Sequence, residues 1–425
     1  MFRFIYLRRQ IILLYAIFLF LDAAGRADDK LTQVWGRQLG TSNKETSRSI
    51  VGDDEGNSYI AGYTMGKIGD EAFGGNDVIV IKYDNSGNIV WTQQFGTTQD
   101  DKAVYITYQK GSIYICGETS GKLGSSHIGG TDAFFSKLNT DGKLLWTKQF
   151  GTAADDTANR VVLDDSGNIY FTGSTQGKLA NEHYGGKDAY ACKYSESGEL
   201  IWQTQIGTKG IEDASGISID RSGNVYIAGA TDANMGGTSS GEMDIFIALL
   251  SPNGNMLWCK QYGTAFNDFA TNVIVDKKGY VYVSGHTAGD LFGSQKGGGD
   301  GFVCRCDSQG EITWGQQFGT ELWDLPWGMI LCKDGSNDVL LGGCQHYYPC
   351  QAFMRRYDEQ GNTKFIYEII RDSSYGVCGK NISMDNLGNY YITGTTHLDL
   401  FDTNKGETDM FIAQFVLDTS SSSEE

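Results

Sequence analysis

The stretch GTAADDTANRVVLDDSGNIYFTGSTQGKLANEHYGGKDAYACKYSESGELIW, from Gly151 to Trp202, decides the fold because it recurs with variation along the chain. Its closing tryptophan returns at a spacing of 53 to 56 residues, and a tyrosine takes its place in the last copy: Trp35, Trp91, Trp146, Trp202, Trp258, Trp314 and Tyr367. Seven copies at a near-constant period indicate an array of one supersecondary unit, whose copies pack against their neighbours as one cooperative body.

Each copy divides into four short segments with the composition of β-strands. In the stretch above they are ANRVVLD, NIYFTGST, DAYACKY and ELIWQTQIG. Turns of the type DxxGN join them, such as DDSGN at Asp164 and DNSGN at Asp84. Glycine supplies a positive φ in such turns, and Asp or Asn bonds to its own backbone, so these are hairpin turns. The unit is therefore expected to be a four-stranded antiparallel meander.

The second strand of the unit predicts how the meanders pack. Its copies, such as IYFTG at Ile169 and VYIAG at Val225, are apolar on both faces instead of alternating. A strand buried on both sides belongs to a sheet between two other sheets. Seven four-stranded sheets packed in this way predict an all-β fold, a seven-bladed β-propeller.

The two ends of the repeat region predict how the ring closes. The last copy ends with the third strand, Asp409 to Asp418, and has no fourth strand of its own. The segment Leu31 to Gly40 (LTQVWGRQLG) has the pattern of a fourth strand with no third strand before it. Pairing of these two segments would complete the seventh blade and leave no blade with an unpaired edge.

The repeat resembles that of the bacterial seven-bladed β-propeller repeat family. The motifs that carry the resemblance are WTQQFGT at Trp91, WTKQFGT at Trp146, GGTDAFFSK at Gly129 and GGKDAYACK at Gly185. The resemblance extends from Leu31 to Asp418. It implies the propeller architecture and an exported or surface-associated protein, and it implies little about activity.

Charge and targeting restrict the partners. The net charge of −18, without a basic stripe, disfavours nucleic acid and anionic membrane surfaces. Arg8 and Arg9 precede the apolar run Ile11 to Leu21 and small residues follow it, which is the order of a secretory signal over residues 1–27. Eleven apolar residues are too few to span a bilayer. We therefore expect a propeller over residues 28–418, a disordered acidic tail over 419–425, and a secreted, periplasmic or cell-surface location.

The cysteines and the recurring acidic residues have structural interpretations. Cys116, Cys192 and Cys304 occupy apolar repeat positions and are expected in the core. Cys344 and Cys350 enclose one short loop and are a possible disulfide in an oxidising compartment. An acidic residue recurs before the first and third strands, where we expect it to cap loop amides. Rings of carboxylates also leave Ca²⁺ open as a low-ranking alternative, and no other cofactor or metal site is expected.

The sixth copy is where the repeat breaks down. Its link into the first strand is ELWDLPWGM, from Glu321 to Met329, and its long loop is shortened to CQHYYPCQ, from Cys344 to Gln351. Both changes fall on the same predicted face. The residues that these two segments bring together as a candidate ligand-binding surface are Trp323, Asp324, Trp327, His346, Tyr347 and Tyr348. Aromatic side chains with a polar edge suit sugar rings or a protein partner, although they also serve to cover a short blade top.

Three functions stay open at this point. The first is a non-enzymatic exported scaffold that binds a glycan or a protein through its loop-rich face. The second is a hydrolase or lyase that acts on polysaccharide with paired carboxylates in the central funnel, where Asp101, Asp156 and Asp268 are the candidates. The third is an architectural component of the cell surface. Fold analogy does not choose among them.

Overall fold

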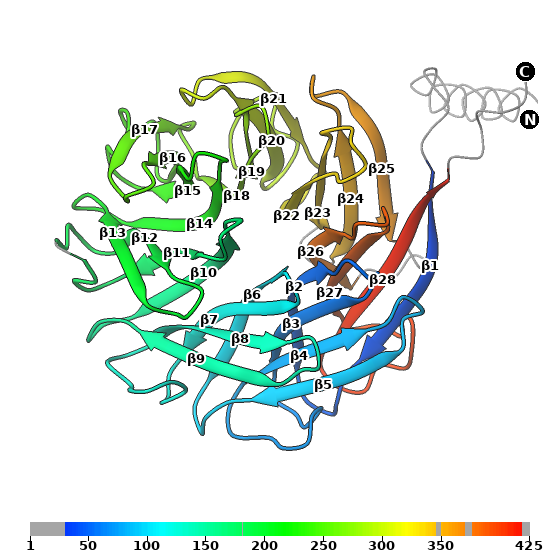
Figure 1. Cartoon of the computed structure of the whole chain (residues 1–425). Coiled ribbons are helices and arrows are strands. Elements are labelled where there is room, and N and C mark those ends of the chain that lie inside the picture. Colours follow the sequence, from blue (N-terminus) through cyan, green and yellow to red (C-terminus); the bar gives the residue numbers. More distant parts are fainter. Residues whose placement is uncertain (1–29, 181, 346–349, 370–375, 419–425) are drawn as a thin grey trace, which may run out of the picture.

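The computed structural model describes residues 30–180, 182–345, 350–369 and 376–418, so the predicted signal segment and the predicted acidic tail lie outside the described residues. In the described residues the chain forms seven four-stranded sheets, all antiparallel. Figure 1 shows the sheets arranged as blades around a central axis. The predicted all-β, seven-bladed propeller is confirmed.

In blades one to six the strands run in chain order from the centre outward, and in blade seven β1 takes the outermost place. Blades one to three are β2 (Glu45–Gly52), β3 (Ser58–Thr64), β4 (Asp77–Tyr83), β5 (Ile89–Phe95); β6 (Asp101–Gln109), β7 (Ser112–Thr119), β8 (Asp132–Asn139), β9 (Leu144–Phe150); β10 (Asp156–Leu163), β11 (Ile169–Thr175), β12 (Asp188–Tyr194), β13 (Leu200–Ile206). Blades four and five are β14 (Glu212–Ile219), β15 (Val225–Thr231), β16 (Asp244–Leu250), β17 (Met256–Tyr262); β18 (Asp268–Val275), β19 (Val281–Thr287), β20 (Asp300–Cys306), β21 (Ile312–Phe318). Blades six and seven are β22 (Leu325–Leu331), β23 (Val339–Gln345), β24 (Gln351–Tyr357), β25 (Thr363–Ile369); β26 (Val377–Met384), β27 (Tyr390–Thr396), β28 (Asp409–Asp418) and β1 (Lys30–Leu39).

Blade seven is assembled from both ends of the chain. Strand β1 pairs antiparallel with β28 from Lys30 opposite Asp418 to Leu39 opposite Met410. The two strands lie side by side at the outer edge of the blade in Figure 1, blue beside red. The pairing gives β28 a neighbour on its outer side, which matches the closure that the sequence predicts.

The core lies between adjacent blades. The second strands β11 and β15 are buried along their whole length, as predicted for strands covered on both faces. The repeated tryptophan links one blade to the next, since Trp35 donates its indole N–H to the carbonyl of Asn85 at 3.1 Å. The turn beneath it contains Gly87 at φ 76°, where an added Cβ would lie 2.6 Å from the Trp35 ring. This turn therefore requires glycine both for its backbone conformation and for the close approach of the indole.

The recurring acidic residues hold loops to strands. Asp132 accepts hydrogen bonds from the backbone N–H of Ile128 at 2.8 Å and from Gln149 Nε2 at 2.7 Å. Asp156 accepts from both the backbone N–H and the hydroxyl of Thr152. The same arrangement recurs in most blades, and these carboxylates are buried. The predicted capping of loop amides is confirmed.

Every innermost strand carries an irregularity in its pairing with the second strand. In blade one the register passes from Ser47 opposite Gly62 to Ser49 opposite Ala61, so Arg48 is an extra residue. Equivalent shifts occur in the other six blades. A β-bulge turns the extra residue away from the regular alternation of the strand. The glycine of the second strand is required here, because a Cβ on Gly62 would collide with the carbonyl oxygen of Thr46.

Blade six replaces one recurring contact with a buried ionic cluster. In blade one the hydroxyl of Tyr59 bonds to Asp53 of the turn, and Leu340 takes the tyrosine position in blade six. There Arg356 donates to Asp338 at 2.7 Å and to the hydroxyl of Tyr390 in blade seven at 2.7 Å. The guanidinium thus joins blade six to blade seven while neutralising a buried carboxylate.

Candidate functional site

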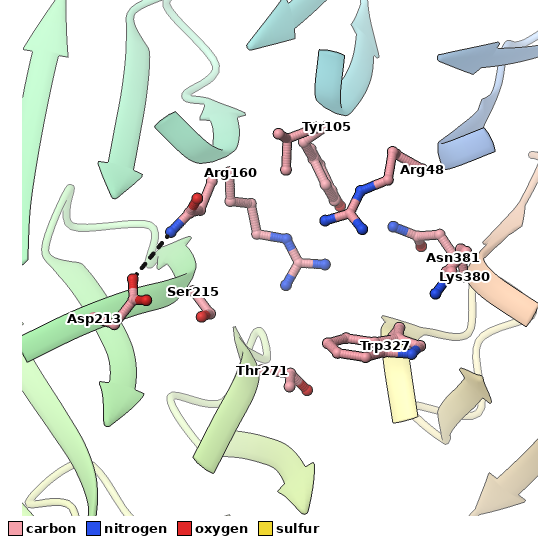
Figure 2. A pocket seen from close by; sticks show the side chains of 11 residues that line it. Arg48, Tyr105, Arg160, Asp213, Ser215, Thr271, Trp327, Lys380 and Asn381 are labelled. Carbon is pink, nitrogen blue, oxygen red and sulfur yellow. Dashed lines mark hydrogen bonds between the residues drawn. The ribbon is translucent and has the colours of Figure 1, made fainter. Parts of the chain in front are cut away.

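The seven bulges place one side chain from each blade in the central channel. These side chains line a cavity of about 250 Å³: Arg48, Val104, Asn159, Ser215, Thr271, Trp327 and Lys380. Tyr105, Arg160, Asp213 and Asn381, their neighbours in sequence, complete the lining. Figure 2 shows the labelled side chains converging from the innermost strands. The frame around this ring is repetitive, whereas the ring itself holds a different residue in every blade.

The cavity lining is positively charged in an otherwise acidic protein. It holds Arg48, Arg160 and Lys380 against one carboxylate, Asp213. Asp213 is already engaged, by Lys187 at 2.7 Å and Asn159 at 3.3 Å. None of these three cations forms an ion pair with a carboxylate of the described residues. The uncompensated charge makes the cavity attractive to an anion.

Arg160 is the most confined of these cations. Its side chain is 5% exposed, and its guanidinium lies 4.5 Å from the centre of the Tyr105 ring. Its Nη1 is buried without a hydrogen-bond partner among the described residues. Figure 2 shows the guanidinium extended into the middle of the channel. A buried N–H donor without an acceptor is costly, so this group is poised to bond a ligand oxygen.

Trp327 forms the opposite wall of the cavity. The ammonium of Lys380 lies 5.4 Å from the centre of its ring, and His286 meets it edge-on at 6.5 Å. The indole N–H of Trp327 is also buried without a partner in the described part of the chain. The cavity therefore has two aromatic walls, Tyr105 and Trp327, and a cation lies against each of them. Two of its N–H donors, one on Arg160 and one on Trp327, have no acceptor among the described residues.

The structure describes three of the six residues that the sequence proposes as one surface, and two of them, Trp323 and Trp327, both contact His286. Trp327 lies in the channel, whereas Trp323 is 38% exposed and packs on His286 at 5.9 Å. The carboxylate of Asp324 is buried and accepts from Thr320, as in the other capping residues. The remaining three, His346, Tyr347 and Tyr348, lie outside the described residues.

The carboxylates proposed for an enzyme do not line the cavity. Asp101, Asp156 and Asp268 are buried at the starts of their strands and bond to threonines of the adjoining loops. Burial raises the pKa of all three, with a smaller contribution from a neighbouring carboxylate in each case. In the described residues, no three carboxylates lie close enough together to hold one ion such as Ca²⁺.

The cysteines predicted in the core, Cys116, Cys192 and Cys304, are buried. Cys344 and Cys350 do lie close together, and a third thiol, Cys378 from blade seven, lies beside them. Sequence reasoning did not find this third thiol because it belongs to the next copy of the repeat.

Sequence reasoning also missed the ring, although the sequence contains a signal for it. The ring position follows the capping acid by three residues in six blades, as in Glu45 to Arg48 and Asp156 to Asn159. The copies disagree at this position, and the glycine inside the second strand marks the bulge opposite it. A variable position within a constant frame is the pattern expected of a binding residue on a rigid scaffold.

Three comparisons place the chain among known proteins. A family model described as Beta-propeller repeat matches residues 34–69, 145–179, 201–235 and 257–293. The chain is 24% identical over 356 residues to the regulatory protein FlaEY of Caulobacter vibrioides, a match that covers 72% of this chain and 37% of the relative. It is 22% identical over 233 residues to a WD repeat-containing protein of Acanthamoeba polyphaga mimivirus, covering 42% of this chain and 17% of the relative. The chain thus spans well under half the length of either relative.

Solved structures show the same architecture at low sequence identity. The WD40 β-propeller domain of Doa1 has a TM-score of 0.53 at 11% identity and covers 93% of this chain and 100% of that domain. The WD40 domain of Neurospora crassa Pan2 has a TM-score of 0.54 at 10% identity, and the match covers 91% of this chain and 96% of that domain. No helix in the described residues is long and apolar enough to cross a membrane. The Beta-propeller repeat thus matches four segments of a chain that folds as a seven-bladed β-propeller.

Proposed function

We propose that this propeller is an extracytoplasmic binding protein that holds an acidic saccharide in the cavity of its central channel, which the bulge residues and their neighbours line. The observation that carries the proposal is Arg160, a buried cation with an unused donor that points into the cavity beside two further cations. Carboxylate and sulfate groups are the natural partners of a guanidinium, which bonds them through two parallel N–H groups.

The size of the cavity and its aromatic walls support a sugar as the carrier of that anion. A volume of about 250 Å³ lies below the range of about 300–1,000 Å³ that is usual for drug-sized ligands, so it suits one sugar-sized group. Tyr105 and Trp327 offer apolar surface with polar edges, which suits the mixed faces of a sugar ring. The predicted secretory signal supports the location outside the cytoplasm.

The site supports binding better than catalysis. Glycoside hydrolysis by the usual route needs two carboxyl groups flanking the scissile bond. The single carboxylate in the lining, Asp213, is paired with Lys187. A purely architectural role would not require three cations to face one another without counter-ions in the described residues. The binding scaffold is therefore the function that the geometry favours.

The test is calorimetric titration of the protein with a panel of saccharides that differ in charge. Uronate- and sulfate-bearing oligosaccharides are expected to bind, and neutral analogues of the same length are not. Arg160→Gln keeps much of the side-chain volume and removes the charge, and loss of a charged hydrogen bond worth about 1.5–3 kcal/mol weakens binding roughly 10- to 150-fold. Added sulfate should compete with the acidic saccharide in the unmodified protein.

Two control variants locate the site. Arg221→Gln changes an exposed arginine in the turn between β14 and β15, outside the cavity lining, and should leave affinity unchanged, which excludes a general effect of net charge. Trp323→Ala should also leave affinity unchanged, whereas Trp327→Ala should reduce it, because only the latter side chain lines the cavity. Equal binding of neutral and acidic saccharides, or full affinity in Arg160→Gln, would refute the proposal. Binding confined to acidic peptides would refute the saccharide as ligand.

A further inference from the structure

Three thiols from two blades meet at one point of the interface between blades six and seven. The Sγ atoms of Cys344, Cys350 and Cys378 all lie within 4.8 Å of one another. They form the only group of three or more His, Cys, Asp or Glu side chains within reach of one ion in the described part of the chain.

The backbone holds each thiol in place independently. Cys344 lies on β23, between its partners Leu325 and Ala352 on the flanking strands. Cys378 lies on β26, paired with Thr395. The third is anchored between the blades, since the carbonyl of Cys350 accepts hydrogen bonds from the amides of Gly376 at 2.9 Å and Val377 at 3.1 Å.

The three thiols differ in burial, and the cluster runs from the core to the surface. Cys344 is 0% exposed and Cys378 is 8% exposed, whereas Cys350 is partly exposed. An ion could enter from the side of Cys350 and be held against the two buried sulfurs. The other six cysteines do not gather in this way, which makes the cluster a local feature of blades six and seven.

We propose that Cys344, Cys350 and Cys378 form a three-thiolate site for one thiophilic metal ion of the Zn²⁺ type. A Zn–S bond is about 2.3 Å long, so two sulfurs of a tetrahedral site lie about 3.8 Å apart. The three Sγ atoms all lie within 4.8 Å of one another, which places them within reach of that geometry. Thiolate donors select soft or borderline ions such as Zn²⁺ or Cu⁺ over Ca²⁺ and Mg²⁺. Each thiol that binds releases its proton to solvent.

The arrangement favours a metal over the disulfide that the sequence suggests. A Cys344–Cys350 disulfide uses two of the thiols and leaves Cys378 without a chemical reason to approach them. A metal ion uses all three, and it joins blade six to blade seven by bonds from both. Binding of an ion that the unfolded chain cannot hold in this geometry stabilises the folded state.

The test is titration of the reduced, metal-free protein with Co²⁺, whose thiolate complexes absorb in the near ultraviolet and visible, followed by displacement with Zn²⁺. One equivalent per chain is expected, with a rise in melting temperature. Cys350→Ser and Cys378→Ser should each weaken binding by at least about tenfold, because loss of a ligand should cost no less than the roughly 10- to 100-fold that loss of an outer-shell partner costs. Circular dichroism checks that each variant is folded, and Cys350→Ser is the less disruptive change because that side chain is partly exposed.

Cys259→Ser is the matched control, since Cys259 is a partly exposed cysteine on β17, in blade four. It should bind Co²⁺ as the unmodified protein does. The proposal is overturned if the reduced protein takes up no metal, or if Cys350→Ser and Cys378→Ser bind as tightly as Cys259→Ser. It is also overturned if peptide mapping finds a Cys344–Cys350 disulfide that, once reduced, gives a protein without metal affinity. None of these outcomes depends on whether the central channel binds a saccharide.

Discussion

Replacing Arg160 with methionine should make the empty protein more stable while it weakens anion binding at least about tenfold. Most substitutions of a buried residue destabilise a protein, so the expected sign is unusual. It follows from the position of the guanidinium, which is 5% exposed, has an unpartnered Nη1 among the described residues, and shares its cavity with Arg48 and Lys380.

The magnitude can be worked out from the contacts. An unsatisfied buried donor costs about 1–3 kcal/mol, and the substitution removes that cost. The contact of the guanidinium with the Tyr105 ring, at 4.5 Å, contributes about 0.5–2 kcal/mol in the opposite direction. Methionine keeps the apolar stem of the side chain in the same space. The net expectation is a gain of about 1 kcal/mol in the free energy of unfolding. Removal of the positive charge also relieves repulsion from Arg48 and Lys380, which adds to the gain.

Urea unfolding followed by tryptophan fluorescence measures this difference. Arg37→Met is the matched control, because Arg37 donates to the carbonyls of Gly87, Gly36 and Ser86 at 2.7 to 3.0 Å and should therefore lose stability on the same substitution. A loss of more than about 1 kcal/mol in Arg160→Met would show that Arg160 is a structural residue, and the reasoning about an unsatisfied donor would be refuted.

Ligand should reverse the order of stability. An acidic saccharide at 100 times its dissociation constant stabilises the unmodified protein by about 2.7 kcal/mol, more than the expected gain of the empty variant. Arg160→Met should show little shift under the same conditions. Equal shifts for the two proteins would place the ligand elsewhere.

Three further predictions concern the scaffold. Burial lowers the pKa of His286 to about 4, so between about pH 6.5 and 4 the unfolded chain binds a proton at this residue and the folded chain does not. The free energy of unfolding should therefore fall by up to about 3 kcal/mol as the pH drops through this window. His286→Phe should remove that part of the pH dependence, which urea unfolding at several pH values measures. Arg356→Met should lower the free energy of unfolding by about 3–5 kcal/mol, because it leaves the carboxylate of Asp338 buried and unpaired. Adding Asp338→Asn to this variant should recover part of that loss. A loss below about 1 kcal/mol for the single variant would contradict this expectation. Gly87→Ala should lower the melting temperature because its Cβ would meet the Trp35 ring at a positive φ, whereas an unchanged melting temperature would show that the turn can move.

Much of the scaffold could be predicted from the sequence because each blade repeats the same local sequence patterns. The hairpin turns, the doubly buried second strand and the capping carboxylates depend on contacts within one copy or with its nearest neighbour, and seven copies make each pattern visible. The pairing of β1 with β28 also follows from counting strands, since one end lacks what the other end supplies.

The candidate site was harder to predict because its residues differ from copy to copy, and the repeat does not show that they meet in one cavity. The sequence places Trp323 and Trp327 on one blade top. The bulge in β22 turns Trp327 into the channel, whereas Trp323 stays 38% exposed, and both tryptophans contact His286. A bulge is a property of the pairing between two strands, so its effect on side-chain direction appears only when the register is known.

The sequence by itself determined the number of blades, the order of their strands, the closing strand and the buried carboxylates, because these depend on a periodic pattern of apolar residues and turns. Only the tertiary structure decided which side chains meet. It brings Arg48, Arg160, Lys380 and Trp327 from four blades into one cavity, and Cys378 beside Cys344 and Cys350. The physical reason is that closure of the ring joins residues far apart in sequence, and their proximity leaves no periodic trace in the chain.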